Sequence, residues 1–199
     1  MNFCSECGSA VSLRFLPDEG KERYVCDNCG MVHYQNPKIL VGCIVNHGDS
    51  ILLMKRANSP GKDKWCAPSG FMESEETLEE AAVRETFEET GVSIPPEDVD
   101  LHTITSLKDI SEVYVVFRAE VQSRDIEIGE EALDAAWFTK EQLPWDDLAF
   151  VESYGFFRLF FRELERGEYS VHVSRADGLG KYRVSYPTSP PQCAGSGGV

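Results

Sequence analysis

The sequence predicts an α+β fold, in which a mixed β-sheet is covered by helices and preceded by a small cysteine-rich module. Short aliphatic runs alternate with two helix-like segments between about residues 35 and 170, as in mixed α and β domains. Four of the seven cysteines lie in the first 34 residues, and 42% of the 199 residues are apolar, which is enough to bury a core. We therefore expect a module over 1–34, a main domain over 35–172 and a flexible tail over 173–199, whose end is rich in Pro, Gly and Ser.

Two strand pairs and one further strand are predicted in the main domain. Residues 39–45 and 51–54 are aliphatic runs on either side of an Asn-His-Gly-Asp turn, which indicates a hairpin. Residues 101–107 and 113–121 form a second pair, and residues 135–139 a shorter strand.

Two helices are predicted, over 77–90 and from 146 or 147 to about 165. Thr77 and Glu80 form a capping box at the start of the first helix, and Gly91 is a suitable stop at its end. The second helix carries several phenylalanines, which are more typical of core packing than of a cofactor site.

The charge balance restricts the partners. The net charge of −15 argues against a general nucleic-acid binder, which needs a basic surface, although it is also compatible with a solubility role or a salty habitat. No run of 18 apolar residues and no signal peptide is present, so we expect a cytoplasmic protein without membrane contact. An anionic substrate would have to be held by local cations or by a metal.

The cysteine module has the spacing of a zinc site. Cys4 and Cys7 form one C-x-x-C pair, Cys26 and Cys29 form another, and each pair is followed by glycine. Four thiolates give the closed tetrahedral site that structural zinc favours, and a module this small needs such a staple. The alternative, two disulfides, requires an oxidising compartment. His33 is expected to be a packing or surface residue, and the other three cysteines are expected to be free thiols.

The first helix carries an unusual set of carboxylates. At 100° per residue, its apolar face continues into Glu85, Glu88 and Glu89 in the last turns. Like charges at these spacings repel, and anions near a helix C-terminus oppose the helix dipole. A solvated Glu-rich surface is the alternative, but the arc favours a metal site, and carboxylate oxygens select Mg²⁺ or Mn²⁺ over zinc.

These residues match a known pattern. The segment from Gly70 to Val92 resembles the Nudix box, G-x5-E-x7-R-E-U-x-E-E-x-G-U, in which U is aliphatic. The fixed positions are filled by Gly70, Glu76, Arg84, Glu85, Glu88, Glu89, Gly91 and Val92. Thr86 is the one departure, at a position that is usually aliphatic, and should affect packing rather than chemistry. The resemblance implies an α/β/α sandwich that hydrolyses a nucleoside diphosphate linked to another moiety.

The resemblance also implies roles for the matched residues. The ligands of Mg²⁺ or Mn²⁺ would be the carbonyl of Gly70 and the carboxylates of Glu85, Glu88 and Glu89. Arg84 would instead be structural and would pair with Glu76, since it lies off the arc of the metal ligands. Metal ions would neutralise the phosphates and activate water, so no nucleophilic side chain is needed.

Three further candidates are less constrained. The general base is Glu88, Glu89 or, as our choice, Glu131, for which a solvated loop carboxylate is the alternative. Glu73 is expected to join the metal and substrate site. Arg56 is expected to contact a substrate phosphate, and a surface ion pair is its alternative.

The combination of a zinc ribbon and a Nudix box indicates the substrate class. It is similar to NADH pyrophosphatases and to a neighbouring group that cleaves FAD and ADP-ribose, over residues 1 to about 172. The S-Q-P-W motif of the NADH enzymes is absent, whereas the segments 34–38, 41–44, 70–73 and 143–150 look like the second group. The resemblance therefore implies FAD or ADP-ribose as the substrate and AMP as a product.

Other functions stay open at this point. NADH cleavage and the removal of NAD or FAD caps from RNA break the same bond, although the acidic surface disfavours long RNA. A binding module on a non-catalytic Nudix scaffold is the alternative outside enzymology; the loss of ligand glutamates would support it, and none is lost. The resemblance also allows a homodimer.

Overall fold

The computed structural model describes residues 1–177 and 181–187 and divides the chain into two units, Met1–Pro37 and Lys38–Val199. The predicted fold class is confirmed, because a mixed sheet with two helices follows a cysteine-rich unit. No helix of the described residues is long and apolar enough to cross a membrane.

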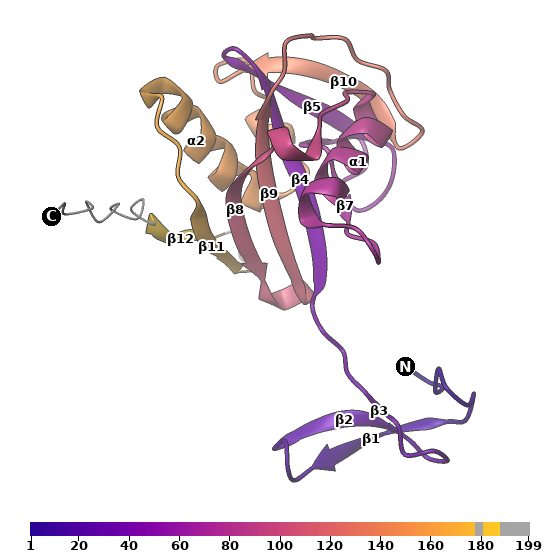
Figure 1. Ribbon diagram of the computed structural model, residues 1–199. Coiled ribbons are helices and arrows are strands. Elements are labelled where there is room, and N and C mark those ends of the chain that lie inside the picture. The colour runs from indigo at the N-terminus through magenta and orange to yellow at the C-terminus, as the bar shows by residue number, and fades with distance from the viewer. Residues whose placement is uncertain (178–180, 188–199) are drawn as a thin grey trace, which may run out of the picture. The chain divides into compact units, whose positions relative to one another are not determined.

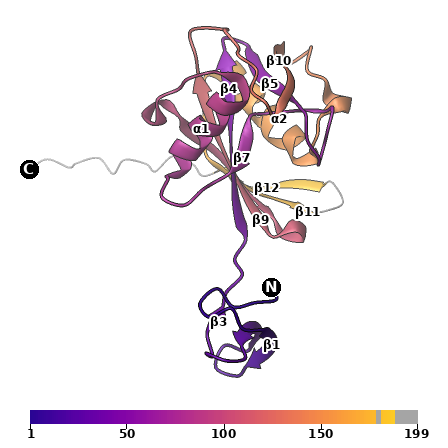
Figure 2. The ribbon, with the colours of Figure 1, turned by 90° about the vertical axis from the view of Figure 1, so that its right-hand side faces the viewer.

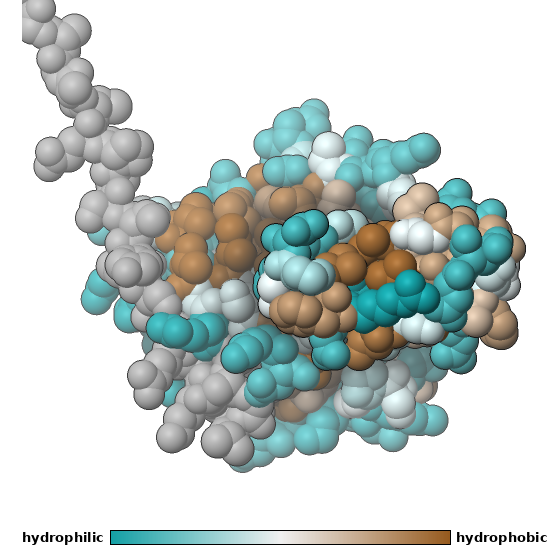
Figure 3. All heavy atoms as spheres, turned by 90° about the horizontal axis from the view of Figure 1, so that it is seen from below, coloured by the Kyte–Doolittle hydropathy of each residue, from teal (hydrophilic) through white to brown (hydrophobic). Residues whose placement is uncertain are grey.

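The first unit is a three-stranded antiparallel sheet. Its strands, in spatial order, are β1 (Val11–Leu16), β2 (Lys21–Cys26) and β3 (Val32–His33). The unit buries few apolar side chains, whereas Phe3, Leu13 and Phe15 are exposed, and Figure 3 shows brown apolar atoms on this unit among hydrophilic ones. So small a core needs a covalent or metal staple.

The second unit is built on a nine-stranded sheet (Figures 1 and 2). The seven strands of its main path follow the order β10-β5-β4-β9-β8-β11-β12, while β6 pairs with β5 and β7 with β4. The pairs β4–β9 and β8–β11 are parallel and the others antiparallel. The strands are β4 (Lys38–His47), β5 (Ser50–Arg56), β6 (Trp65–Cys66), β7 (Ser69–Phe71), β8 (Asp100–Leu107), β9 (Glu112–Glu120), β10 (Ala132–Thr139), β11 (His172–Asp177) and β12 (Lys181–Pro187).

The two helices cover opposite faces of this sheet (Figure 2). Helix α1 (Leu78–Thr90) packs Ala81 and Ala82 into one core together with Val41 of β4. Helix α2 (Val151–Arg166) packs its phenylalanines into the other core, to which Ile44 of β4 contributes. The alternation of side chains along β4 thus fills both layers of an α/β/α sandwich.

Three 3₁₀ turns complete the second unit: Pro96–Asp98, Lys108–Ile110 and Trp145–Asp147. The last of them corrects the predicted start of the second helix, which we placed at 146 or 147. Leu148 adopts an extended conformation and pairs with Trp65, and the N–H of Ala149 donates to Trp65 O at 2.8 Å. These long-range contacts keep the chain extended until α2 begins at residue 151.

The C-terminal region also differs from the prediction. We expected a flexible tail from residue 173, but the backbone of β11 pairs with β8 and that of β12 pairs with β11. Parallel pairing with a strand about seventy residues upstream leaves no local trace in the sequence. The parts of the predicted tail at 178–180 and 188–199 lie outside the described residues.

Candidate active site

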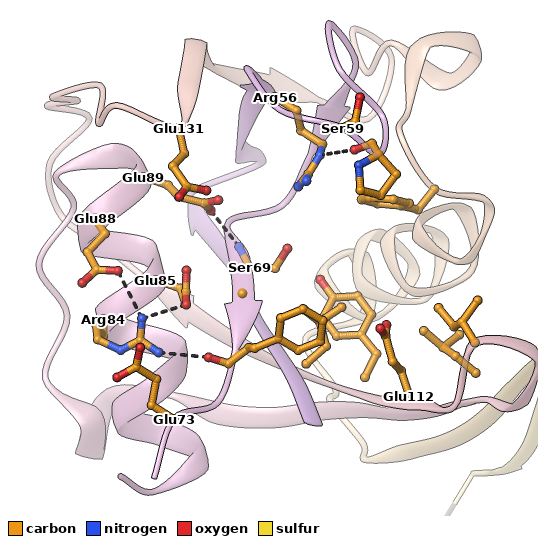
Figure 4. A pocket seen from close by; sticks show the side chains of 18 of the residues that line it. Arg56, Ser59, Ser69, Glu73, Arg84, Glu85, Glu88, Glu89, Glu112 and Glu131 are labelled. Atoms are coloured by element: carbon orange, nitrogen blue, oxygen red, sulfur yellow. Dashed lines mark hydrogen bonds and ion pairs between the residues drawn. The ribbon is translucent and has the colours of Figure 1, made fainter. Parts of the chain in front are cut away.

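A cavity of about 950 Å³ lies in the second unit, beside the C-terminal half of α1 (Figure 4). Helix α1 supplies four charged side chains to its wall, and β7 supplies Gly70 and Phe71. Further wall residues come from the end of β5, the start of β9 and the loop that precedes β10. Segments far apart in the sequence therefore converge on one cavity.

Helix α1 is fixed at both ends by local interactions, as predicted. The hydroxyl of Thr77 accepts a hydrogen bond from Glu80 N at 3.2 Å, and the Glu80 carboxylate accepts one from Thr77 N at 2.7 Å. Gly91 ends the helix in the left-handed conformation, with φ of 71°. Thr86, the departure from the motif, is fully buried, and its hydroxyl donates to Ala82 O at 2.7 Å. The polar group is thus satisfied within the helix.

The three predicted ligand glutamates line the cavity but differ in exposure. Glu89 is only 4% exposed and accepts a hydrogen bond from Ser69 N at 2.8 Å. The side chain of Glu85 is 15% exposed, whereas that of Glu88 is 57% exposed. Burial raises the pKa of Glu89 to about 8 and also raises the pKa of Glu85. The buried arc of the helix therefore extends to Glu85 and Glu89, with Glu88 at the rim of the cavity.

Arg84 lies at the centre of the acidic wall. Its guanidinium donates to Glu76 at 2.9 and 3.0 Å, and this contact lowers the pKa of that carboxyl. It also donates to Glu85 at 2.7 Å and to Glu88 at 3.1 Å (Figure 4). The helical wheel separates Arg84 from the ligand arc, but its long side chain reaches back to two of these carboxylates. The same guanidinium thus ties the loop to the helix and neutralises part of the acidic wall.

The carboxylate of Glu85 lies directly over the backbone of Gly70. A Cβ atom at this position would lie 2.1 to 2.2 Å from the carboxylate atoms of Glu85. Gly70 pairs with Val41 of β4, so the sheet holds its backbone in place. A side chain here would have to displace the Glu85 carboxylate.

The loop before β10 packs against the end of α1 and brings Glu131 into the cavity. The N–H of Gly129 donates to Glu89 O at 3.2 Å, and a Cβ atom at Gly129 would lie 1.8 Å from Glu88 O. The loop thus satisfies a carbonyl that the helix end leaves unpaired. Glu131 lies beside Glu89 in Figure 4, and its charge contributes to the raised pKa of Glu89.

Arg56 and Glu73 lie in different parts of the wall. Arg56 donates to Pro60 O at 2.7 Å, lies 5.2 Å from the ring centroid of Phe150, and forms no ion pair with any described residue. Its guanidinium therefore faces the cavity as a cation that forms no ion pair with a carboxylate in the described part of the chain (Figure 4). Glu73 is exposed near Arg84, and its N–H donates to Glu76 at 2.6 Å.

The apolar end of the cavity was missed in the sequence. Phe71, Ile110, Tyr114 and Phe150 line it, together with the carboxylate of Glu112. Phe71 follows the motif glycine directly, which is the one local signal available. The others depend on the register of β9 and on the loop before α2, which residue patterns do not specify.

The four predicted cysteine ligands lie together in the first unit. Their sulfur atoms are within 4.8 Å of one another, and they form the one such cluster of His, Cys, Asp and Glu ligands among the described residues. The N–H groups of Asn28 and Cys29 point at the sulfur of Cys26, each at 3.4 Å. His33, which we expected at the surface or in packing, lies 3.3 Å from the sulfur of Cys4. Four clustered sulfurs with N–H donors fit a structural zinc ion.

Burial of Glu89 makes the stability of the protein without Mg²⁺ or Mn²⁺ depend on pH. Its pKa is about 8 in the folded chain, against 4.5 for an exposed glutamate, so folding takes up a proton between these values. Raising the pH from about 5 to about 8 should lower the free energy of unfolding by roughly a few kcal/mol. Urea titrations in buffer free of Mg²⁺ and Mn²⁺, without a chelator so that zinc is retained, should show this decline in wild type and a flatter profile in Glu89→Gln. An equal decline in both proteins would contradict the assignment.

Each of the two units matches a known protein family. Residues 36–160 match the NUDIX domain family, and residues 2–35 match the zinc-ribbon family described as Nudix N-terminal. The chain is 34% identical over 122 residues to an ADP-ribose pyrophosphatase of Methanocaldococcus jannaschii, an alignment covering 56% of this chain and 67% of that protein. It is 33% identical over 145 residues to the NAD-capped RNA hydrolase NudC of Chromobacterium violaceum, with 71% of this chain covered. The aligned region spans about half of that relative, at 51% of its length.

A solved structure agrees over most of the chain. The crystal structure of a NUDIX hydrolase from Nitrosomonas europaea superposes with a TM-score of 0.81 at 39% identity. The match covers 88% of this chain and 99% of that one. The similarity therefore extends beyond the motif of α1.

Proposed function

The chain belongs to the Nudix hydrolase family, and on that premise we propose that it cleaves the diphosphate bond of FAD or ADP-ribose and releases AMP. One observation carries the proposal. The motif glutamates of α1 and Glu131 face one cavity, and Arg56, which forms no ion pair with any described residue, lies in the same cavity. An acidic wall that can hold divalent cations, with an arginine nearby, suits a charged diphosphate.

We propose that Glu85, Glu88 and Glu89, with the Gly70 carbonyl, bind Mg²⁺ or Mn²⁺. The donor set consists of hard oxygens, and two of the carboxylates are largely buried, where a cation would compensate their charge. When bound, the metal supplies charge neutralisation at the phosphates and a more acidic water. Arg84 holds Glu85 and Glu88 in place and keeps the motif loop against the helix.

Two further residues act on the substrate in this proposal. The Arg56 guanidinium donates hydrogen bonds to a phosphate and orients the diphosphate against the acidic wall. Glu131 accepts the proton of the attacking water, because it lies beside Glu89 and its carboxylate accepts no hydrogen bond from a described residue (Figure 4). Glu88 and Glu89 are the alternative bases, although the raised pKa of Glu89 disfavours it while no cation is bound. Glu73 contacts the substrate at the rim of the site.

The first unit has a structural role in the proposal. Cys4, Cys7, Cys26 and Cys29 bind zinc and leave no coordination position open for chemistry. We accordingly propose a zinc ribbon over 1–34 and a Nudix domain that follows it, and the two family matches, which meet at residues 35 and 36, support this division.

A panel of substrates tests the reaction and separates the candidates. FAD, ADP-ribose, NADH, NAD⁺ and an NAD-capped RNA are incubated with Mg²⁺ or Mn²⁺, and released AMP or decapped RNA is quantified. We expect the highest kcat/KM with FAD or ADP-ribose, and no hydrolysis in EDTA. Preference for the capped RNA would favour the activity named for the NudC relative instead. Absence of hydrolysis of every substrate would refute the proposed enzyme.

A further inference from the structure

We propose that Glu112 binds the vicinal hydroxyls of a ribose and thereby excludes nucleotides that carry a 2′-phosphate. The inference rests on the proposed function, because it concerns the part of the nucleotide that extends beyond the diphosphate. It assigns a role to a carboxylate that lies in the same cavity but outside the Nudix motif.

Along β9, Glu112 lies three residues from the row of the sheet that contains Gly70. Gly70 of β7, over which Glu85 lies, pairs with Val41 of β4, and the next row across the sheet is Phe71, Leu40 and Tyr114. Glu112 stands two residues before Tyr114, on the same face of β9. Glu85 covers Gly70 from the side of α1, whereas Leu40 and Tyr114 belong to the core on the side of α2, and the cavity is lined from both sides. A nucleotide that fills this cavity from the acidic wall to its far end would bring its nucleoside to Glu112.

The row of Phe71, Leu40 and Tyr114 offers a surface for a planar ring. Phe71 is 44% exposed and lines the cavity, with the ammonium of Lys38 4.9 Å from its ring centroid. Tyr114 is buried, and its ring meets that of Phe156 edge to face at 5.8 Å between centroids. The exposed ring of Phe71 can thus stack on a base while Tyr114 forms a fixed floor.

Glu112 is available for a ligand. Its side chain is half-buried and points into the cavity in Figure 4, and it forms no hydrogen bond or ion pair with any residue in the described part of the chain. An ionised carboxylate only accepts hydrogen bonds, so a ribose, with two adjacent hydroxyl donors, is complementary to it. An acidic residue fulfils this role for the ribose 2′-hydroxyl in dinucleotide-binding folds, where it opposes a 2′-phosphate.

Product binding tests the inference independently of turnover. Dissociation constants for AMP, dAMP and adenosine 2′,5′-bisphosphate are measured by calorimetry in Mg²⁺ with wild type, Glu112→Ala and Glu120→Ala. Glu120 is an exposed glutamate on the same strand and serves as the matched control. Wild type and Glu120→Ala should lose roughly tenfold in affinity when the 2′-hydroxyl is absent, because a charged hydrogen bond is lost.

Glu112→Ala should bind AMP and dAMP nearly equally and should bind the 2′,5′-bisphosphate more tightly than wild type does. The affinities of ribose 5-phosphate and 2-deoxyribose 5-phosphate are compared in the same way. A ratio between them that changes in Glu112→Ala would support the diol contact at the other product. An AMP to dAMP ratio, and a ribose to deoxyribose ratio, that are the same in Glu112→Ala and wild type would overturn the inference. If Glu112→Ala alters these affinity ratios but the wild-type protein hydrolyses no dinucleotide, the proposed function is refuted and the contact between Glu112 and the ribose is supported.

Discussion

Replacing Glu88 or Glu89 by glutamine is expected to lower kcat by about 10³-fold while the protein folds normally. The amide keeps the shape of the side chain but removes the charge that would hold a divalent cation. At position 89 the amide oxygen can still accept the hydrogen bond from Ser69 N. The fold should tolerate the change, because burial already disfavours the charged form of this carboxyl.

Steady-state kinetics at several Mg²⁺ concentrations, with thermal unfolding in parallel, measure this effect. Glu79→Gln is the matched control, because Glu79 lies on the same helix but does not line the cavity. It should retain wild-type turnover. Wild-type turnover in both cavity variants would contradict the metal assignment, whatever their unfolding temperatures.

The parts of the fold set by local sequence were predictable. The capping box at Thr77, the stop at Gly91 and the hairpin that joins β4 to β5 all depend on residues a few positions apart. The cysteine pairs follow the same logic, because a C-x-x-C turn brings two sulfurs together without help from the rest of the chain.

The parts set by long-range pairing were not predictable. Nothing in the residues of β11 indicates that it will pair with β8, and the side of the cavity that carries Glu112 depends on the register between β4 and β9. Gly129 is a similar case. Its need for glycine arises from a carbonyl of α1 some forty residues upstream in the chain.

The second role of Arg84 was missed for a different reason. A helical wheel assigns a direction to a Cα–Cβ bond, whereas the arginine side chain is long enough to reach neighbouring carboxylates on the same helix. Side-chain reach therefore decides the electrostatics of the acidic wall. The same reasoning explains why Glu88, although exposed, still lines the cavity.

Replacing Cys4 by serine is expected to unfold the first unit while leaving hydrolysis by the second close to wild type. Cys4 is buried and its sulfur lies within 4.8 Å of the other three, so the substitution removes one of the four proposed zinc ligands. Structural zinc contributes roughly 10 kcal/mol to the folding of such small modules, which exceeds what this small core supplies.

Zinc content and amide NMR spectra separate the two units in this experiment. The variant should lose bound zinc, and the amide signals of β1, β2 and β3 should collapse into the unfolded range while those of the second unit persist, because that unit has cores of its own. Ser5→Ala, an exposed change next to Cys4, controls for local disturbance and should keep its zinc. Retention of zinc and of the β1–β3 signals by Cys4→Ser would exclude a four-cysteine structural site. Loss of hydrolysis together with the signals would instead show that the first unit takes part in the reaction, since the second contains every residue assigned to the diphosphate.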